Sequence, residues 1–202
     1  MPNQKKSDHL PACASCGLPV FERICFTKEG KGTKGCPSLT RTALLKESNT
    51  LYTDENIQHF AHMASSQEAA CYANRDQQPY VMQPSKTRIV EICEFAHRMK
   101  YKRLGLAFCI GLTKEAKVVE EIFSGYGFEV VSVCCKAGRS SKDLIDIAED
   151  EKIFKGTDEA MCNPIFQAKV LDADKTDLNI MLGLCVGHDT LFFQHTKTPT
   201  TL

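Results

Sequence analysis

Residues 103–135 read RLGLAFCIGLTKEAKVVEEIFSGYGFEVVSVCC, which is an apolar run, an amphipathic stretch and a second apolar run. The two runs, at 104–109 and 128–134, predict buried strands. Between them, apolar side chains recur at helical spacing from Thr113, a suitable helix cap, until two glycines end the pattern. This order of strand, helix and strand predicts one βαβ unit of a parallel sheet.

The chain after this unit continues the same alternation. A charged loop at 136–159 leads to a helix that Asn163 and Pro164 are suited to begin. Residues 178–184 then predict a third strand, and residues 188–195 a final helix.

Two further helices are predicted before the unit, at 55–71 and 87–101. A breaker-rich stretch with Pro79 and Pro84 separates them. Cys93 lies on an apolar stripe at helical spacing in the second helix, so we expect it in the core.

These patterns predict an α/β protein with a Rossmann-like or flavodoxin-like, three-layer parallel sheet. We expect a Cys-rich metal-binding head, a loop module, at 1–45, and an α/β domain at 46–202. Within that domain, 46–102 is a helical lead-in and 103–202 holds the sheet. A length of 202 residues is enough for one core and a small appended module.

The charge of the chain is balanced, with 25 Lys and Arg against 25 Asp and Glu. No net field therefore draws it to nucleic acid or to an anionic membrane, and we expect neither as a partner. The apolar stretch at 104–112 is far shorter than the ~20 residues of a membrane helix. The expected compartment is the cytoplasm, and the oligomeric state is left open.

The eleven cysteines stand out against this background. Their number is odd, so they cannot all pair as disulfides. In a reducing compartment such cysteines favour metal binding or thiol chemistry over a disulfide framework.

One group of cysteines follows the predicted strands or precedes a predicted helix. The carboxyl ends of parallel strands form the edge where α/β sheets bind ligands, so we expect these thiols to share one metal site with His188 nearby. The expected ligands at this edge are Cys109, Cys134, Cys135, Cys162 and Cys185.

A second group lies in the glycine-rich head and comprises Cys13, Cys16, Cys25 and Cys36. Four thiols suit a tetrahedral ion, and a C-x2-C step lets two sulfurs bind zinc at about 2.3 Å each. Pro37 follows Cys36, as is seen beside some cysteines that ligate iron–sulfur clusters. The expected cofactor is zinc or an iron–sulfur cluster.

Four motifs carry a resemblance to a known family: GLAFCIGL at 105–112, VSVCCK at 131–136, MCNP at 161–164 and GLCVGHD at 183–189. Together they resemble an uncharacterised cysteine-rich metal-binding protein family, a domain of unknown function found mainly in anaerobic bacteria and archaea. The resemblance implies metal binding without a settled reaction. It also implies that the family chain continues beyond residue 202 into another strand.

Two alternatives to a metal site with redox or sulfur chemistry at the sheet edge remain open. One is a structural zinc protein or metal carrier without catalysis. The other is a hydrolase with Cys185 as nucleophile and His188 as its candidate partner, because residues 183–187 fit a G-x-C-x-G nucleophile elbow. A metal ion is the expected partner, and a small-molecule substrate is left open.

Overall fold

The computed structural model describes residues 10–202 and divides the chain into two compact units, Met1–His62 and Met63–Leu202. The boundary predicted between residues 45 and 46, which separates the head from the α/β domain, stays a prediction. Within residues 10–202, no helix combines the length and apolar character needed to cross a membrane.

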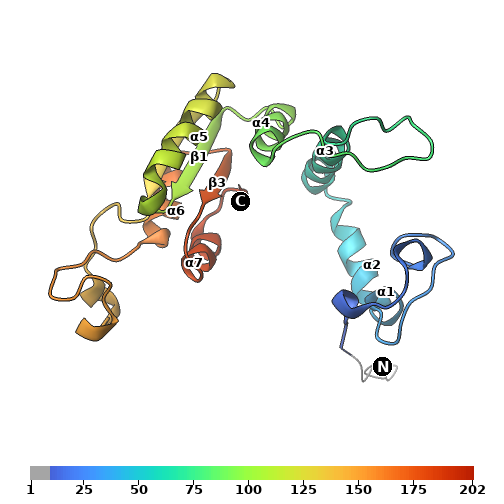
Figure 1. Ribbon diagram of the computed structural model, residues 1–202, viewed down its shortest axis with the longest axis horizontal. Coiled ribbons are helices and arrows are strands. Elements are labelled where there is room, and N and C mark those ends of the chain that lie inside the picture. Colours follow the sequence, from blue (N-terminus) through green and yellow to red (C-terminus); the bar gives the residue numbers. More distant parts are fainter. Residues whose placement is uncertain (1–9) are drawn as a thin grey trace. The chain divides into compact units, whose positions relative to one another are not determined.

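The sheet has four strands, all parallel, in the order β2-β1-β3-β4. Figure 1 labels the two central strands, β1 and β3, which lie side by side. The strands are β1 (Arg103–Phe108), β2 (Glu129–Cys134), β3 (Leu178–Leu182) and β4 (Thr200–Thr201). The predicted α/β class with a Rossmann-like or flavodoxin-like parallel sheet is confirmed.

Seven α-helices and five short 3-10 turns make up the helical part of residues 10–202. The α-helices are α1 (Pro37–Thr40), α2 (Thr42–Leu51), α3 (Glu55–Ala70), α4 (Arg88–Arg98), α5 (Thr113–Gly125), α6 (Pro164–Ala173) and α7 (His188–His195). Short 3-10 turns are η1 (Cys13–Ser15), η2 (Val20–Glu22), η3 (Ile110–Leu112), η4 (Lys142–Ile145) and η5 (Glu149–Glu151).

The two faces of the sheet are covered by different helices, which makes the three layers. Alternate residues of a strand point to opposite faces, so Leu106 of β1 packs with α4 and α5, including the fully buried Cys93 and Phe123. Ala107 packs on the other face with α6 and α7, including Phe192. The expected core position of Cys93 is confirmed.

Some elements were not predicted. The head was expected to be a loop module up to residue 45, but α1 and α2 begin at Pro37 and Thr42. The turns η4 and η5 interrupt the predicted loop at 136–159. Strand β4 was also missed, because two threonines carry no apolar alternation that would mark a strand.

Asp172, near the end of α6, holds the segment that leads into β4. Its Oδ1 accepts hydrogen bonds from Thr196 Oγ1 at 3.2 Å and from Thr198 Oγ1 at 3.1 Å. The same carboxylate accepts the backbone N–H of Lys197 at 3.1 Å. These bonds turn the chain after α7 back toward the sheet, where Asn179 pairs with Thr200.

We expect Asp172→Ala to lower the free energy of unfolding by about 1–3 kcal/mol, because several donors lose their acceptor. Chemical denaturation measures this. The matched control is Asp174→Ala, since the exposed Asp174 side chain makes no hydrogen bond within residues 10–202 and should change stability by less than about 0.5 kcal/mol. Equal losses in both variants would contradict the role of Asp172.

Candidate functional site

The carboxyl ends of three strands are level at one edge of the sheet. Phe108 of β1 pairs with Cys134 of β2 on one side and with Leu182 of β3 on the other. Cys109 and Cys135 are the next residues along β1 and β2, and backbone bonds extend the ladders to them: Cys109 N–H donates to Leu182 O at 3.1 Å and Cys135 N–H to Phe108 O at 2.8 Å. Parallel pairing thus delivers the thiols of Cys109, Cys134 and Cys135 to one edge, while the predicted metal site there stays a prediction.

Two of the edge thiols are in contact. Cys162 Sγ lies 3.6 Å from Cys135 Sγ, although 26 residues separate them in sequence. Cys135 is 2% exposed, whereas Cys162 is partly exposed. The backbone N–H of Ile110, at the start of η3, also donates to Cys135 Sγ, at 3.3 Å.

The environment of Cys135 disfavours its thiolate. Burial is the main cause that raises its pKa, to about 12, and the N–H of Ile110 opposes this rise. The neighbouring Cys162 and Cys109 raise it further, because a second negative charge nearby is unfavourable. The thiols of Cys109 and Cys162 therefore lie close enough to Cys135 to oppose a negative charge on it.

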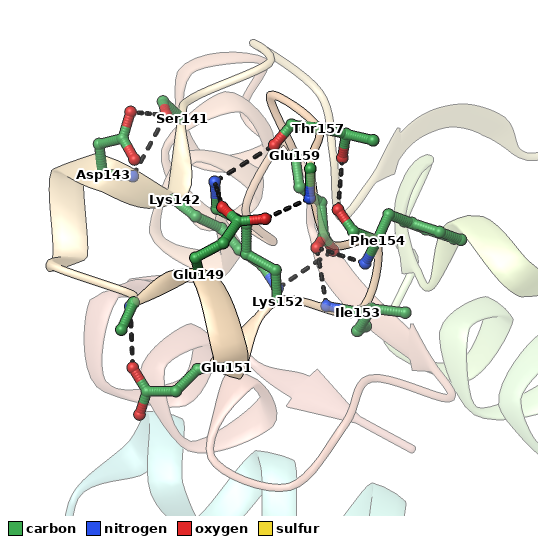
Figure 2. A network of polar contacts seen from close by, with 12 residues as sticks. Ser141, Lys142, Asp143, Glu149, Glu151, Lys152, Ile153, Phe154, Thr157 and Glu159 are labelled. Carbon is green, nitrogen blue, oxygen red and sulfur yellow. Dashed lines mark hydrogen bonds and ion pairs between the residues drawn. The ribbon is translucent and has the colours of Figure 1, made fainter.

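A network of polar contacts fixes the loop that ends in Cys162 (Figure 2). The buried Glu159 carboxylate lies 3.1 Å from Lys142 Nζ and accepts the N–H groups of Ile153 at 2.9 Å and Phe154 at 3.1 Å. Lys136 Nζ lies 3.7 Å from the same carboxylate. Burial alone would raise the pKa of Glu159, but the Phe154 N–H, Lys142 and the Ile153 N–H outweigh it and lower this pKa.

The sequence did not identify this anchor, because the charges between β2 and α6 were interpreted only as a polar loop. The one available signal was a glutamate close before the Met161-Cys162-Asn163-Pro164 motif. A charge in a loop does not by itself reveal that the loop buries it.

The remaining edge cysteines are less closely tied to this pair. Cys134 is the last residue of β2 and is partly exposed, and Cys185 is exposed between β3 and α7. Within residues 10–202, neither the Cys185 thiol nor the His188 ring makes a hydrogen bond. A hydrolase needs an oriented base beside its nucleophile, so this geometry does not favour the hydrolase alternative.

The glycine before Cys185 has a packing role that accounts for part of the G-x-C-x-G pattern. Gly183 has φ +63°, and a Cβ there would lie 2.2 Å from Leu112 Cδ1. A side chain at this position would be strained by the positive φ and would require the Leu112 side chain of η3 to move.

The four head cysteines line one cavity of about 50 Å³. Arg23 and Lys31 also line this cavity. Arg23 holds the C-x2-C segment in place, because its Nε donates to Leu18 O at 2.8 Å and its Nη2 to Cys16 O at 3.2 Å. The thiols are Cys13, Cys16, Cys25 and Cys36.

The wall of the head cavity is tightly packed at Gly32, where an added side chain would push its neighbours aside. A Cβ on Gly32 would lie 3.0 Å from Cys36 Sγ and 2.7 Å from Leu39 Cδ1. Within residues 10–202, however, no three Cys, His, Asp or Glu side chains are grouped closely enough to hold a metal ion. The head thiols share a cavity without converging on a single point.

The comparisons with known proteins agree with an uncharacterised family. A family model described as a protein of unknown function (DUF1847) matches residues 36–202. An uncharacterized protein of Methanocaldococcus jannaschii is 40% identical over 189 residues, which cover 94% of this chain and 83% of that protein. The matched range contains the five edge cysteines and, of the head cysteines, Cys36.

We expect alkaline pH to destabilise the fold through the buried thiols. Burial raises the pKa of Cys93 from 9.0 to about 11, and that of Cys135 to about 12. Both thiols are neutral in either state below about pH 9, but above it only the unfolded chain ionises readily. The unfolding free energy should therefore fall by on the order of 1 kcal/mol per pH unit for each thiol between about pH 9 and 11.

Denaturation under reducing conditions across this pH range measures the effect. Cys93→Ala removes one of the two thiols, so its stability should fall less steeply with pH. An identical slope in Cys93→Ala would show that Cys93 does not contribute.

Proposed function

The chain belongs to the DUF1847 family of proteins of unknown function, and from this premise we propose that it binds metal through cysteine thiolates in its head. The proposed cofactor is zinc or an iron–sulfur cluster. Cys13, Cys16, Cys25 and Cys36 would hold it.

The observation that carries this proposal is the single cavity lined by all four head thiols. Thiolate is the preferred ligand of zinc and of iron–sulfur clusters, and four of them complete a tetrahedral site. Bringing the sulfurs to about 2.3 Å from one ion requires the cavity to contract around it. Such a contraction is in keeping with a short loop module that orders around its metal.

The charges around the cavity support thiolates. Four thiolates and one divalent ion carry a net charge of −2, which is costly without nearby cations. Arg23 and Lys31 both line the cavity, and Arg23 is already fixed by its bonds to two backbone carbonyls. A cation held in position offsets this charge at little further entropic cost.

The head also lacks the apolar core that would otherwise stabilise it. Among residues 10–62 the one buried residue is Gly35, and η1, η2, α1 and α2 bury none. In such a module the free energy of metal binding contributes directly to folding. The metal could stabilise the head, be carried to another protein or take part in a reaction. A structural or carrier role is the simplest of these.

The sheet edge is the second proposed metal location. Cys135 lies close to Cys109 and Cys162 there, and Cys134 and Cys185 lie at the same edge. The redox or sulfur chemistry that we propose, with a small-molecule substrate, would take place at this edge. All four head thiols already line one cavity, so the head is the better supported of the two.

The test is metal analysis of anaerobically purified protein for iron, zinc and acid-labile sulfide, together with its visible spectrum. We expect the Cys16→Ser, Cys36→Ser double variant to lose one metal centre per chain, because two of four ligands are removed. Proteolysis of the head should accelerate in this variant while residues 103–202 stay resistant. Metal left in this variant is bound elsewhere, with the sheet edge as the next place to examine.

Two glycines provide a matched control for the geometry. Gly32→Ala should lower metal occupancy, since its Cβ would press on Cys36 Sγ at 3.0 Å. Gly17→Ala should leave occupancy unchanged, because a Cβ there meets no atom within 4 Å. Wild-type protein without stoichiometric metal, or a double variant with full metal content, would refute the head site.

A further inference from the structure

The contact between Cys135 and Cys162 joins two thiols of different accessibility. Their sulfurs are 3.6 Å apart, and a disulfide brings two sulfurs to about 2.05 Å. A closure of about 1.5 Å is within reach of side-chain rotation and a small backbone shift. Cys162 is open to solvent in part, whereas Cys135 lies behind it at 2% exposure.

The backbone on both sides of Cys162 is bonded to the segment that begins with Cys135. On one side, Met161 N–H donates to Ser140 O at 2.8 Å. On the other side, Asn163 N–H donates to Cys135 O at 2.7 Å. These bonds hold the two cysteines together whether or not their sulfurs are linked.

Side chains strengthen the same attachment. Lys136, next to Cys135, donates through Nζ to Ala160 O at 2.5 Å. Glu159 is anchored by Lys142 and by two backbone N–H groups, so the approach to Cys162 is fixed from within the loop (Figure 2). These side-chain contacts therefore help to hold the sulfurs of Cys135 and Cys162 close together.

We propose that Cys135 and Cys162 form a dithiol–disulfide couple that reduces small-molecule disulfides, with Cys162 as the attacking thiol and Cys135 as the resolving thiol. The exposure of the two residues assigns these roles, since an incoming disulfide reaches Cys162 first. Neither thiol is a head ligand, so failure of this proposal and failure of the head metal site are separate results. A metal ion held by Cys135 and Cys162 at the sheet edge would exclude the disulfide and would count against this proposal.

The reaction balances without a further cofactor. The Cys162 thiolate attacks one sulfur of the substrate disulfide, whose S–S bond breaks as a mixed disulfide forms and one substrate thiolate leaves. Cys135 then attacks Cys162 Sγ as its proton passes to the departing second substrate thiolate, so the protein disulfide forms and the bond between Cys162 and the substrate sulfur breaks. Two protein thiols lose two electrons and two protons, and the substrate disulfide gains them as two thiols.

Glu159 is the positioning residue for this couple. Glu159→Gln removes the charge that binds Lys142 and Lys136, so the loop should hold Cys162 less firmly. We expect the equilibrium constant for forming the Cys135–Cys162 disulfide in a glutathione redox buffer to fall by about tenfold. The matched control is Glu151→Gln, an exposed glutamate of the same loop with one hydrogen bond, to Ala148 N–H, and it should leave the constant unchanged. Equal constants in both variants would remove Glu159 from the proposal.

The direct test treats reduced, full-length protein with oxidised glutathione, quenches with acid, blocks free thiols and maps the bonds by mass spectrometry. We expect a Cys135–Cys162 link in wild type, glutathione retained on Cys162 in Cys135→Ser, and neither product at these positions in Cys162→Ser. Cys134→Ser is the matched control for the adjacent thiol and should keep the link. Thermal unfolding of each variant checks that it is folded.

Three results would overturn the proposal. The first is wild-type protein without the Cys135–Cys162 link, which needs no variant to interpret. The second is loss of the link in a folded Cys134→Ser variant. The third is glutathione that stays on Cys162 in wild type to the same extent as in Cys135→Ser, because Cys135 would then resolve nothing.

Discussion

Parallel pairing on both sides of β1 is the constraint on which the sheet edge depends. Because β2, β1 and β3 run in one direction with Cys134, Phe108 and Leu182 at the same level, the residues that follow them emerge side by side. Helices cover both faces of such a sheet, so its carboxyl edge is the place where side chains can meet a ligand. Side chains from separate segments of the chain therefore meet in the loops at that edge.

The loop between β2 and α6 shows how a buried charge supports such an arrangement. Removing a carboxylate from water is unfavourable unless charges and hydrogen bonds compensate for the lost hydration. Glu159 receives two backbone N–H groups and two lysines, and its pKa is lowered in spite of its burial. The loop must adopt one path to supply these partners, and this path ends where Cys162 meets Cys135.

Much of the α/β domain could be predicted from sequence, because strand and helix periods differ clearly there. The predicted final helix at 188–195 coincides with α7, and β1 lies one residue earlier than predicted. Proximity of thiols at strand ends followed from topology alone. Which thiols touch could not be predicted, since the contact of Cys135 with Cys162 depends on the path of the loop between β2 and α6, and the sequence does not show that this loop buries Glu159. The head helices were missed because α1 has only four residues and α2 buries none of its side chains.

The two cysteine groups differ in what holds them, and this difference separates their chemistry. Around the head cavity, within residues 10–62, Gly35 is the one buried residue, so no apolar core holds the four sulfurs, and a bound metal would add to the hydrogen bonds of Arg23 and the backbone. At the sheet edge, backbone bonds and a buried ion-pair network already fix the two sulfurs. A metal ion stabilises a segment most where the segment lacks a core of its own, because the free energy of metal binding then contributes to folding. Two thiols form a disulfide most readily where the folded protein already holds them side by side, because positioned sulfurs react as if at high local concentration. The head therefore suits a metal and the Cys135–Cys162 pair suits electron transfer between sulfurs.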